Sequence, residues 1–179
     1  MNRKTPGASL RSLIVALMLM GLLTSAAAAS ADDGFAGGHG NLVSGGELRT
    51  FSFAVVQQAD GTVTGTAQVK NRSLDVTLHI AIDCLKFEQG NRAIMSGPIT
   101  QSSNPTLIVP GRIAVFGVED NGEGGAAPAD RITTIPDYPP PKSCNEFTFV
   151  DSTLRDVANL GIVVRPLTPI VNGNIQVRP

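Results

Sequence analysis

The sequence predicts an all-β protein, an antiparallel β-barrel or barrel-like sandwich of about eight strands with at most one short helix. Two observations lead to this fold class. Apolar and polar residues alternate with a period of two along most of the chain after Glu47, as in strands that bury one face. Turn-forming pairs such as Asp60-Gly61 and Asn172-Gly173 separate these segments. A parallel α/β fold is excluded, because it needs a helix between successive strands.

Three strands are expected between Glu47 and Asp83. The third shows the strictest alternation, and its apolar face is formed by Leu74, Val76, Leu78, Ile80 and Ile82. Cys84 continues this parity, so we expect its sulfur on the core side. Small inward residues such as Gly65 and Ala67 leave space in the barrel. The phenylalanines of the neighbouring strand are large enough to fill that space, and we expect a filled interior.

The later strands are marked by shorter alternating runs over 93–100, 112–118 and 131–135, followed by one around Phe147 and Phe149. The segment 151–161 has apolar residues at threefold spacing and ends at a glycine, which predicts a short helix. Residues 173–178 are expected to pair with 41–44, because pairing the last strand with the first removes both exposed sheet edges.

The N-terminal segment, residues 1–31, has the layout of a secretory signal peptide. Basic residues precede an apolar stretch from Leu13 to Leu23, and Ala29-Ser30-Ala31 provides a cleavage site. The apolar stretch is too short to span a bilayer as a helix. We therefore expect an exported protein, periplasmic or extracellular, with no transmembrane segment in the mature chain.

The rest of the chain is expected to hold one domain. The glycine-rich residues 32–40 indicate a flexible N-terminus, and a single β-barrel domain follows over 41–179, with a Pro-rich insert around 136–169. Cys84 and Cys144 are the only cysteines, and in an exported protein such a pair forms a disulfide more often than two free thiols. The bond would close a loop of about 60 residues and contribute about 4 kcal/mol.

Charge and motifs exclude several functions. The chain has 15 Asp and Glu against 14 Lys and Arg, whereas nucleic-acid binding needs a basic face. Neither a Gly-x-Ser-x-Gly nor a His-Glu-x-x-His motif is present. We therefore expect no enzyme and no nucleic-acid partner; the partner class that fits an exported β-module is a cell-surface or extracellular protein.

The stretch FGVEDNGEGGAAPADRI, residues 116–132, gathers acidic residues in a glycine-rich run. Calcium is bound by such oxygen-bearing side chains, and the weak candidate ligands here are Glu119, Asp120, Asn121, Glu123 and Asp130. The EF-hand spacing is not met, because the third position counted from Asp120 is Gly122. The alternative is a hairpin turn with hydrated charges. A glycosidase pair is disfavoured, since one Tyr and no Trp offer few aromatics for sugar stacking. No other cofactor is expected.

Several segments, taken in order, resemble a family of exported bacterial β-domains of unassigned function. The most specific are VEDNGEG at 118–124 and GNIQV at 173–177, and the resemblance spans roughly residues 41–179. Members of that family occur alone after a signal peptide or at the ends of larger cell-surface proteins. The resemblance implies a β-barrel and carries over no catalytic residues.

These observations favour a non-catalytic structural, adhesive or interaction β-module of the periplasm or cell exterior. One alternative is a lipocalin-like carrier, whose barrel encloses a small apolar ligand. A further alternative is a calcium-binding module built on the 119–130 loop.

Overall fold

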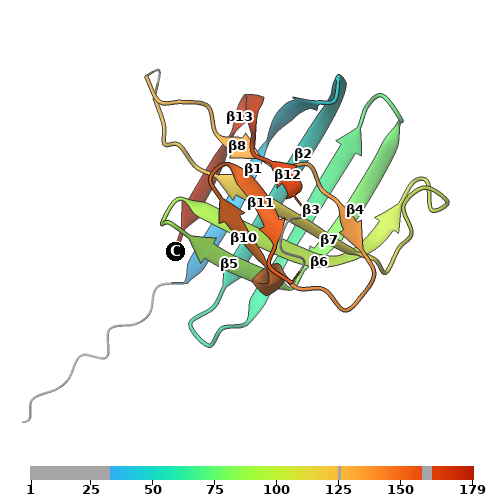
Figure 1. Ribbon diagram of the computed structural model, residues 1–179, viewed down its shortest axis with the longest axis horizontal. Coiled ribbons are helices and arrows are strands. Elements are labelled where there is room, and N and C mark those ends of the chain that lie inside the picture. The colour runs from blue at the N-terminus through green and yellow to red at the C-terminus, as the bar shows by residue number, and fades with distance from the viewer. Residues whose placement is uncertain (1–32, 125, 159–162) are drawn as a thin grey trace, which may run out of the picture.

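The computed structural model describes residues 33–124, 126–158 and 163–179, and the expected signal peptide over 1–31 lies outside this part of the chain. Eight antiparallel strands form a closed barrel (Figure 1), which confirms the predicted fold class. In order around the barrel they are β6 (Arg92–Ser102), β4 (Val76–Ile82), β3 (Val63–Asn71), β2 (Glu47–Gln57), β1 (Gly34–Ser44), β13 (Thr168–Arg178), β8 (Arg131–Ile132) and β7 (Ile113–Glu119), which pairs with β6 again.

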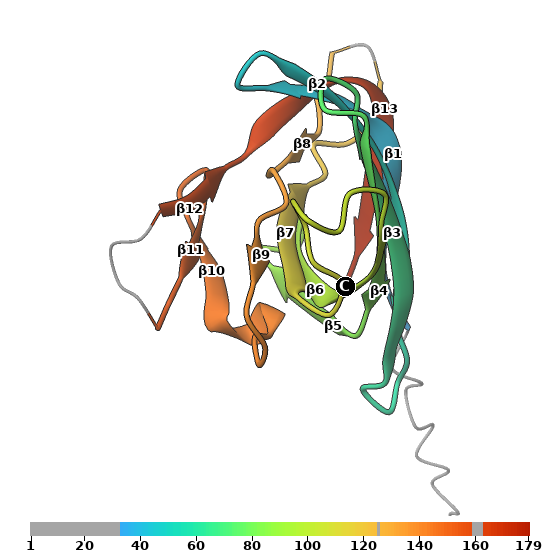
Figure 2. The same cartoon turned by 90° about the vertical axis from the view of Figure 1, so that its right-hand side faces the viewer.

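The remaining elements lie at or outside the barrel wall. β5 (Cys84–Glu88) pairs with β6, and β9 (Asp137–Tyr138) pairs with β7. A 3-10 turn, η1 (Cys144–Glu146), leads into a three-stranded sheet of β10 (Phe147–Val150), β11 (Thr153–Asp156) and β12 (Val163–Pro166). Figure 2 shows this sheet beside the barrel, on the side of β7 and β9. Among the described residues, no helix is long and apolar enough to cross a membrane.

β1 covers most of the segment 32–40, where a flexible N-terminus was expected, so that prediction is wrong. A Cβ on Gly38 would lie 3.0 Å from the Phe53 ring, and one on Gly40 would lie 3.2 Å from the Phe51 ring. These glycines therefore leave room for two inward phenylalanine rings. Because the inner face of β1 is built from small residues, the strand lacks the apolar alternation by which the other strands are recognised.

β1 and β13 close the barrel as predicted, but in a different register. The segment 173–178 pairs with 35–40 rather than with 41–44. β13 begins earlier than expected, at Thr168, so its first residues take the partner positions near the end of β1. Closure along this seam leaves neither strand as an exposed edge.

A β-bulge at Asp83 separates β4 from β5. The N–H of Asp83 donates to the carbonyl of Ser96 at 3.1 Å, and Cys84 is the register partner of the same serine, so two residues oppose one. The bulge reverses the inward parity, and the barrel interior continues from Ile82 to Leu85. Cys84 instead packs against a second apolar cluster outside the barrel. The prediction that its sulfur follows the parity of the barrel core is therefore wrong.

The three-stranded sheet covers the outer face of β6 and β7. The apolar residues buried between them are Ile94, Val115, Cys144, Phe147, Phe149, Leu154 and Leu167. The short helix predicted over 151–161 is wrong, because residues 153–156 form β11, which pairs with β10 and β12; residues 159–162 lie outside the described residues. Of the two described residues of the threefold apolar pattern, Leu154 is buried and Val157 is exposed.

The barrel interior is filled in one half. Phe53 and Phe116 pack edge to face, with ring centroids 5.6 Å apart, and Ile80 and Ile82 belong to the same buried cluster. This half of the barrel is filled by side chains, as the sequence predicted. In the other half, beyond Phe51, the interior opens into a pocket.

Candidate functional site

A pocket of about 680 Å³ occupies the open end of the barrel. It is bounded by the β1–β2 hairpin, the β3–β4 turn, the loop before β7 and the segment 133–137 after β8. Several barrel strands contribute its apolar floor, which consists of Leu42, Phe51, Val69, Val76, Leu78 and Ile132. Small-molecule sites in proteins have volumes of about 300–1,000 Å³ and mostly apolar linings with a few polar groups. The volume of this pocket lies within that range, and its lining combines an apolar floor with polar walls.

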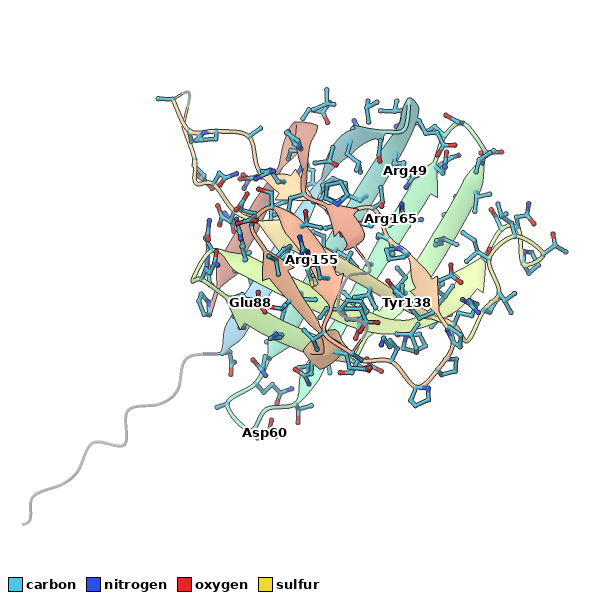
Figure 3. All side chains as sticks on the ribbon, in the orientation of Figure 1. Arg49, Asp60, Glu88, Tyr138, Arg155 and Arg165 are labelled. Carbon is cyan, nitrogen blue, oxygen red and sulfur yellow. A yellow bond between two sulfur atoms is a disulfide. The ribbon has the colours of Figure 1, made fainter. Side chains whose placement is uncertain are left out.

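Two arginines stand on its walls, Arg49 on β2 and Arg165 on β12. Figure 3 labels both side chains. Arg49 has the same strand parity as Phe51 and Phe53, whose rings face inward, so its side chain also emerges on the barrel side of β2. Arg165 is exposed. The outer sheet therefore contributes to the pocket through β12.

Two buried polar atoms of the pocket lack a hydrogen-bond partner among the described residues: Arg49 Nε and Thr134 Oγ1. Thr134 is only 9% exposed. An unsatisfied buried polar group costs about 1–3 kcal/mol, and such groups are rare in native structures. Both atoms belong to residues that line the pocket, which is the placement expected of groups that bind a ligand.

The carboxylates of the pocket are already paired. Arg49 Nη2 donates to Glu47 Oε2 at 2.7 Å, and Asp137 forms an ion pair with Arg112. The hydrogen bond from Arg49 holds the pKa of Glu47 below its ordinary value. The Arg165 side chain forms no hydrogen bond or ion pair with any described residue, and its backbone pairs with Leu154 in the outer sheet. The pocket therefore carries a positive charge that no carboxylate in its walls neutralises.

None of these pocket residues was predicted from the sequence, although one signal was present. Arg49 occupies an inward position of β2, and the next inward residues of this strand are apolar. A charged residue at a position where the alternation predicts an apolar one indicates that the packed core ends there. Nothing comparable marks Thr134 or Arg165, since their role depends on packing between distant segments.

The candidate calcium ligands lie in one loop, but their oxygens serve other bonds. Glu119 accepts hydrogen bonds from Arg92 at 2.7 Å and from Arg131 at 3.1 Å. Burial alone would raise the pKa of Glu119, but the hydrogen bonds and charges of the two arginines outweigh it and lower that pKa. Asp120 accepts from the backbone N–H of Gly122 at 2.8 Å and of Val177 at 3.0 Å.

The other three candidate calcium ligands, Asn121, Glu123 and Asp130, also form hydrogen bonds. Asp130 accepts from the backbone N–H groups of Asn121 and Ile175, and the Asn121 amide donates to the carbonyl of Ala129. Glu123 is exposed and accepts from Gln176 Nε2 at 3.1 Å. In the described part of the chain, no group of three or more His, Cys, Asp or Glu side chains is arranged to hold a metal ion. The calcium site stays a hypothesis beside the hairpin turn, and melting curves in calcium and then in chelator separate the two.

The predicted disulfide between Cys84 and Cys144 is confirmed, with Cα atoms 5.7 Å apart. It joins β5 at the barrel wall to η1 at the start of the outer sheet. Lys86 Nζ adds a hydrogen bond to the carbonyl of Phe147 at 2.8 Å. The wall that carries Arg165 is thus fastened to the barrel covalently as well as by packing.

The chain matches no family model, no curated protein and no solved structure. The resemblance to exported bacterial β-domains therefore stays a prediction.

Proposed function

We propose that this protein is a non-catalytic binding protein that holds a small, largely apolar molecule in the open end of its barrel. The observation that carries the proposal is the pocket of about 680 Å³ with an apolar floor and two unpartnered polar atoms in its lining. A purely structural barrel gains nothing from leaving such atoms buried and unsatisfied. We further propose that the protein works outside the cytoplasm, which the disulfide supports.

An interaction module for a cell-surface or extracellular protein is the second candidate. Several apolar side chains on the segments around the pocket remain exposed: Val43, Leu48, Leu74, Leu107 and Val109. Val43 and Leu48 lie directly opposite each other in the β1–β2 hairpin. Contiguous exposed apolar surface is typical of protein interfaces as well as of the rims of ligand sites, so this feature alone does not separate the two functions.

The two functions are separated by titration with an uncharged apolar fluorophore, N-phenyl-1-naphthylamine. We expect saturable one-to-one binding. The variant Val69→Phe enlarges a floor residue into the pocket and should weaken binding by at least about tenfold, which corresponds to a loss of about 1.4 kcal/mol. The matched control is Val109→Phe, because Val109 is half exposed in the loop before β7 but does not line the pocket.

A cooperative thermal transition close to that of the wild type must accompany the loss in Val69→Phe, so that unfolding is excluded as its cause. If the native protein takes up no probe, or if both variants bind it as the wild type does, the pocket is not the binding site. The interaction module then becomes the better proposal.

A further inference from the structure

We propose that the ligand carries one anionic group, such as a carboxylate or a phosphate, which is held between Arg49 and Arg165 while an apolar tail lies on the floor of the pocket. This inference depends on the proposed function and specifies its ligand class.

The acidic residues of the lining are Glu47 and Asp137, and each is within ion-pair distance of an arginine. Arg165 is left without a carboxylate partner in the described part of the chain. An uncompensated guanidinium beside an apolar floor favours an anion and disfavours a cation. A neutral ligand would form no ion pair with this guanidinium.

The hydrogen-bonding atoms lead to the same ligand class. A guanidinium nitrogen can only donate, so the free Nε of Arg49 requires an acceptor. The Thr134 hydroxyl can donate as well. A carboxylate or phosphate offers several acceptor oxygens, and arginine binds such groups with charge-assisted hydrogen bonds. Thr134 is more than nine-tenths buried, so this part of the site is sheltered from water.

The apolar floor of the pocket indicates that the remainder of the ligand is apolar. Phe51, Val69 and Leu78 belong to the buried core and also line the pocket, so a ligand that covers them loses contact with water over its own apolar surface. The two arginines stand on β2 and β12 and are more exposed than the floor residues Phe51, Val69 and Leu78. The arrangement fits an amphiphile that enters tail first.

The test uses displacement of N-phenyl-1-naphthylamine from the purified protein by decanoate and by decan-1-ol, which have the same chain length but differ in charge. One charge-assisted hydrogen bond corresponds to about tenfold in affinity. We therefore expect decanoate to displace the probe at a concentration about tenfold lower than decan-1-ol does. Added salt should reduce this difference, because Arg165 is exposed.

The central variant is Arg165→Gln, because Arg165 makes no other bond whose loss would disturb the fold. It should weaken decanoate about tenfold and leave decan-1-ol unchanged, and Arg165→Lys should retain part of the preference. Arg49→Gln should show the same selectivity. The matched control is Arg178→Gln, which removes the same charge from the exposed end of β13, outside the lining of the pocket.

The outcomes separate this inference from the proposed function. If decanoate and decan-1-ol displace the probe equally, and Arg165→Gln changes neither, the anionic ligand is ruled out while the pocket remains a binding site. If Arg178→Gln weakens decanoate as much as Arg165→Gln does, the preference comes from overall charge and the inference is also wrong. If neither the probe nor decanoate binds, both proposals are wrong.

Discussion

The buried carboxylate of Asp130 accepts a hydrogen bond from the backbone N–H of Ile175 at 2.7 Å. Its other oxygen accepts from the N–H of Asn121 at 2.9 Å. One side chain thus connects the 119–130 loop with β13, the strand that closes the barrel. Asp120 acts in the same way through the N–H of Val177. Two of the acidic residues that resembled a metal site in the sequence, Asp120 and Asp130, therefore bind backbone N–H groups of the closing strand.

We expect Asp130→Asn to lower the free energy of unfolding by about 1–3 kcal/mol. The amide keeps the shape of the carboxylate, but its NH₂ group must face one of two N–H donors, which leaves a buried donor unsatisfied. Urea unfolding of the variant and the wild type measures the difference. The matched control, Glu123→Gln, changes an exposed carboxylate of the same loop and should remain within about 0.5 kcal/mol. Equal stability of Asp130→Asn and the wild type would contradict this role of Asp130.

Calcium should leave the melting temperature unchanged. Both oxygens of Glu119, Asp120 and Asp130 already accept hydrogen bonds from N–H donors, and a calcium ion would need six to eight oxygen ligands, freed from such bonds. Melting curves in millimolar calcium and then in chelator test this. A rise of several degrees that disappears in Asp120→Ala and Glu123→Ala would establish the calcium site instead.

Acid should destabilise the protein through Glu119. Its pKa in the folded state is lowered, because Arg92 and Arg131 outweigh the opposing effect of burial. A carboxylate whose pKa is depressed on folding stabilises the folded state above the ordinary pKa of Glu, about 4.3. This stability disappears as the pH falls through the folded-state pKa. Urea unfolding at several values between pH 7 and pH 3 should show the loss.

The matched comparison for this pH dependence is Glu119→Gln. The variant should be less stable than the wild type at pH 7, and its stability should fall less steeply below about pH 4.3. An unchanged acid slope in the variant would assign the effect to other carboxylates. Glu88 is the first to examine, because Lys86 and the N–H of Phe149 also lower its pKa against the effect of burial.

The barrel was predictable wherever one face of a strand is apolar. β2, β3 and β4 follow from residues such as Phe53, Val69 and Ile80, which alternate with polar ones. Only the end of β1, residues 41–44, was predicted, because the inward positions of the rest of the strand near Phe53 are glycines, which give no apolar alternation. The bulge at Asp83 was also unpredictable, since a one-residue shift leaves no mark in an otherwise regular alternation.

The pocket was less predictable than the fold. A barrel with space for a ligand was one of the alternatives that the sequence allowed. That space was expected at small inward residues such as Gly65. In the structure a Cβ on Gly65 would lie 2.6 Å from Val55 Cβ, so close packing fills this region. The open part lies instead among Arg49, Thr134 and Arg165, which come from three segments far apart in the chain. Their convergence depends on the tertiary fold.

Loss of the disulfide should weaken the attachment of the outer sheet. We expect the double variant Cys84→Ser and Cys144→Ser to lose about 2–4 kcal/mol of stability, as for native disulfides that close long loops. Hydrogen exchange should increase first in β10 and β11, while the β1–β13 seam stays protected, because the disulfide joins β5 to η1 and not to that seam. Treating the wild type with a reductant should reproduce the effect, and uniform loss of protection would contradict a local role for the bond.

Thr133 and Thr134 provide a comparison between a structural hydroxyl and one proposed to bind ligand. Thr133 Oγ1 accepts a hydrogen bond from the N–H of Gly117 at 3.0 Å, and the residue is 1% exposed. Thr133→Val removes this acceptor, so we expect a loss of about 1–3 kcal/mol. Thr134 Oγ1 has no partner among the described residues, so Thr134→Val keeps the shape of the side chain while removing an unsatisfied buried group.

We therefore expect Thr134→Val to match the wild type in stability or to exceed it by about 1 kcal/mol. Its affinity for decanoate should fall, because the hydroxyl that faces the ligand is gone, while its affinity for decan-1-ol should fall less, since the loss of a hydrogen bond to a charged group is the larger one. Gain of stability with loss of binding is typical of residues kept for function. Destabilisation of Thr134→Val comparable to that of Thr133→Val would instead show that Thr134 supports the fold, and the site would then depend on the two arginines alone.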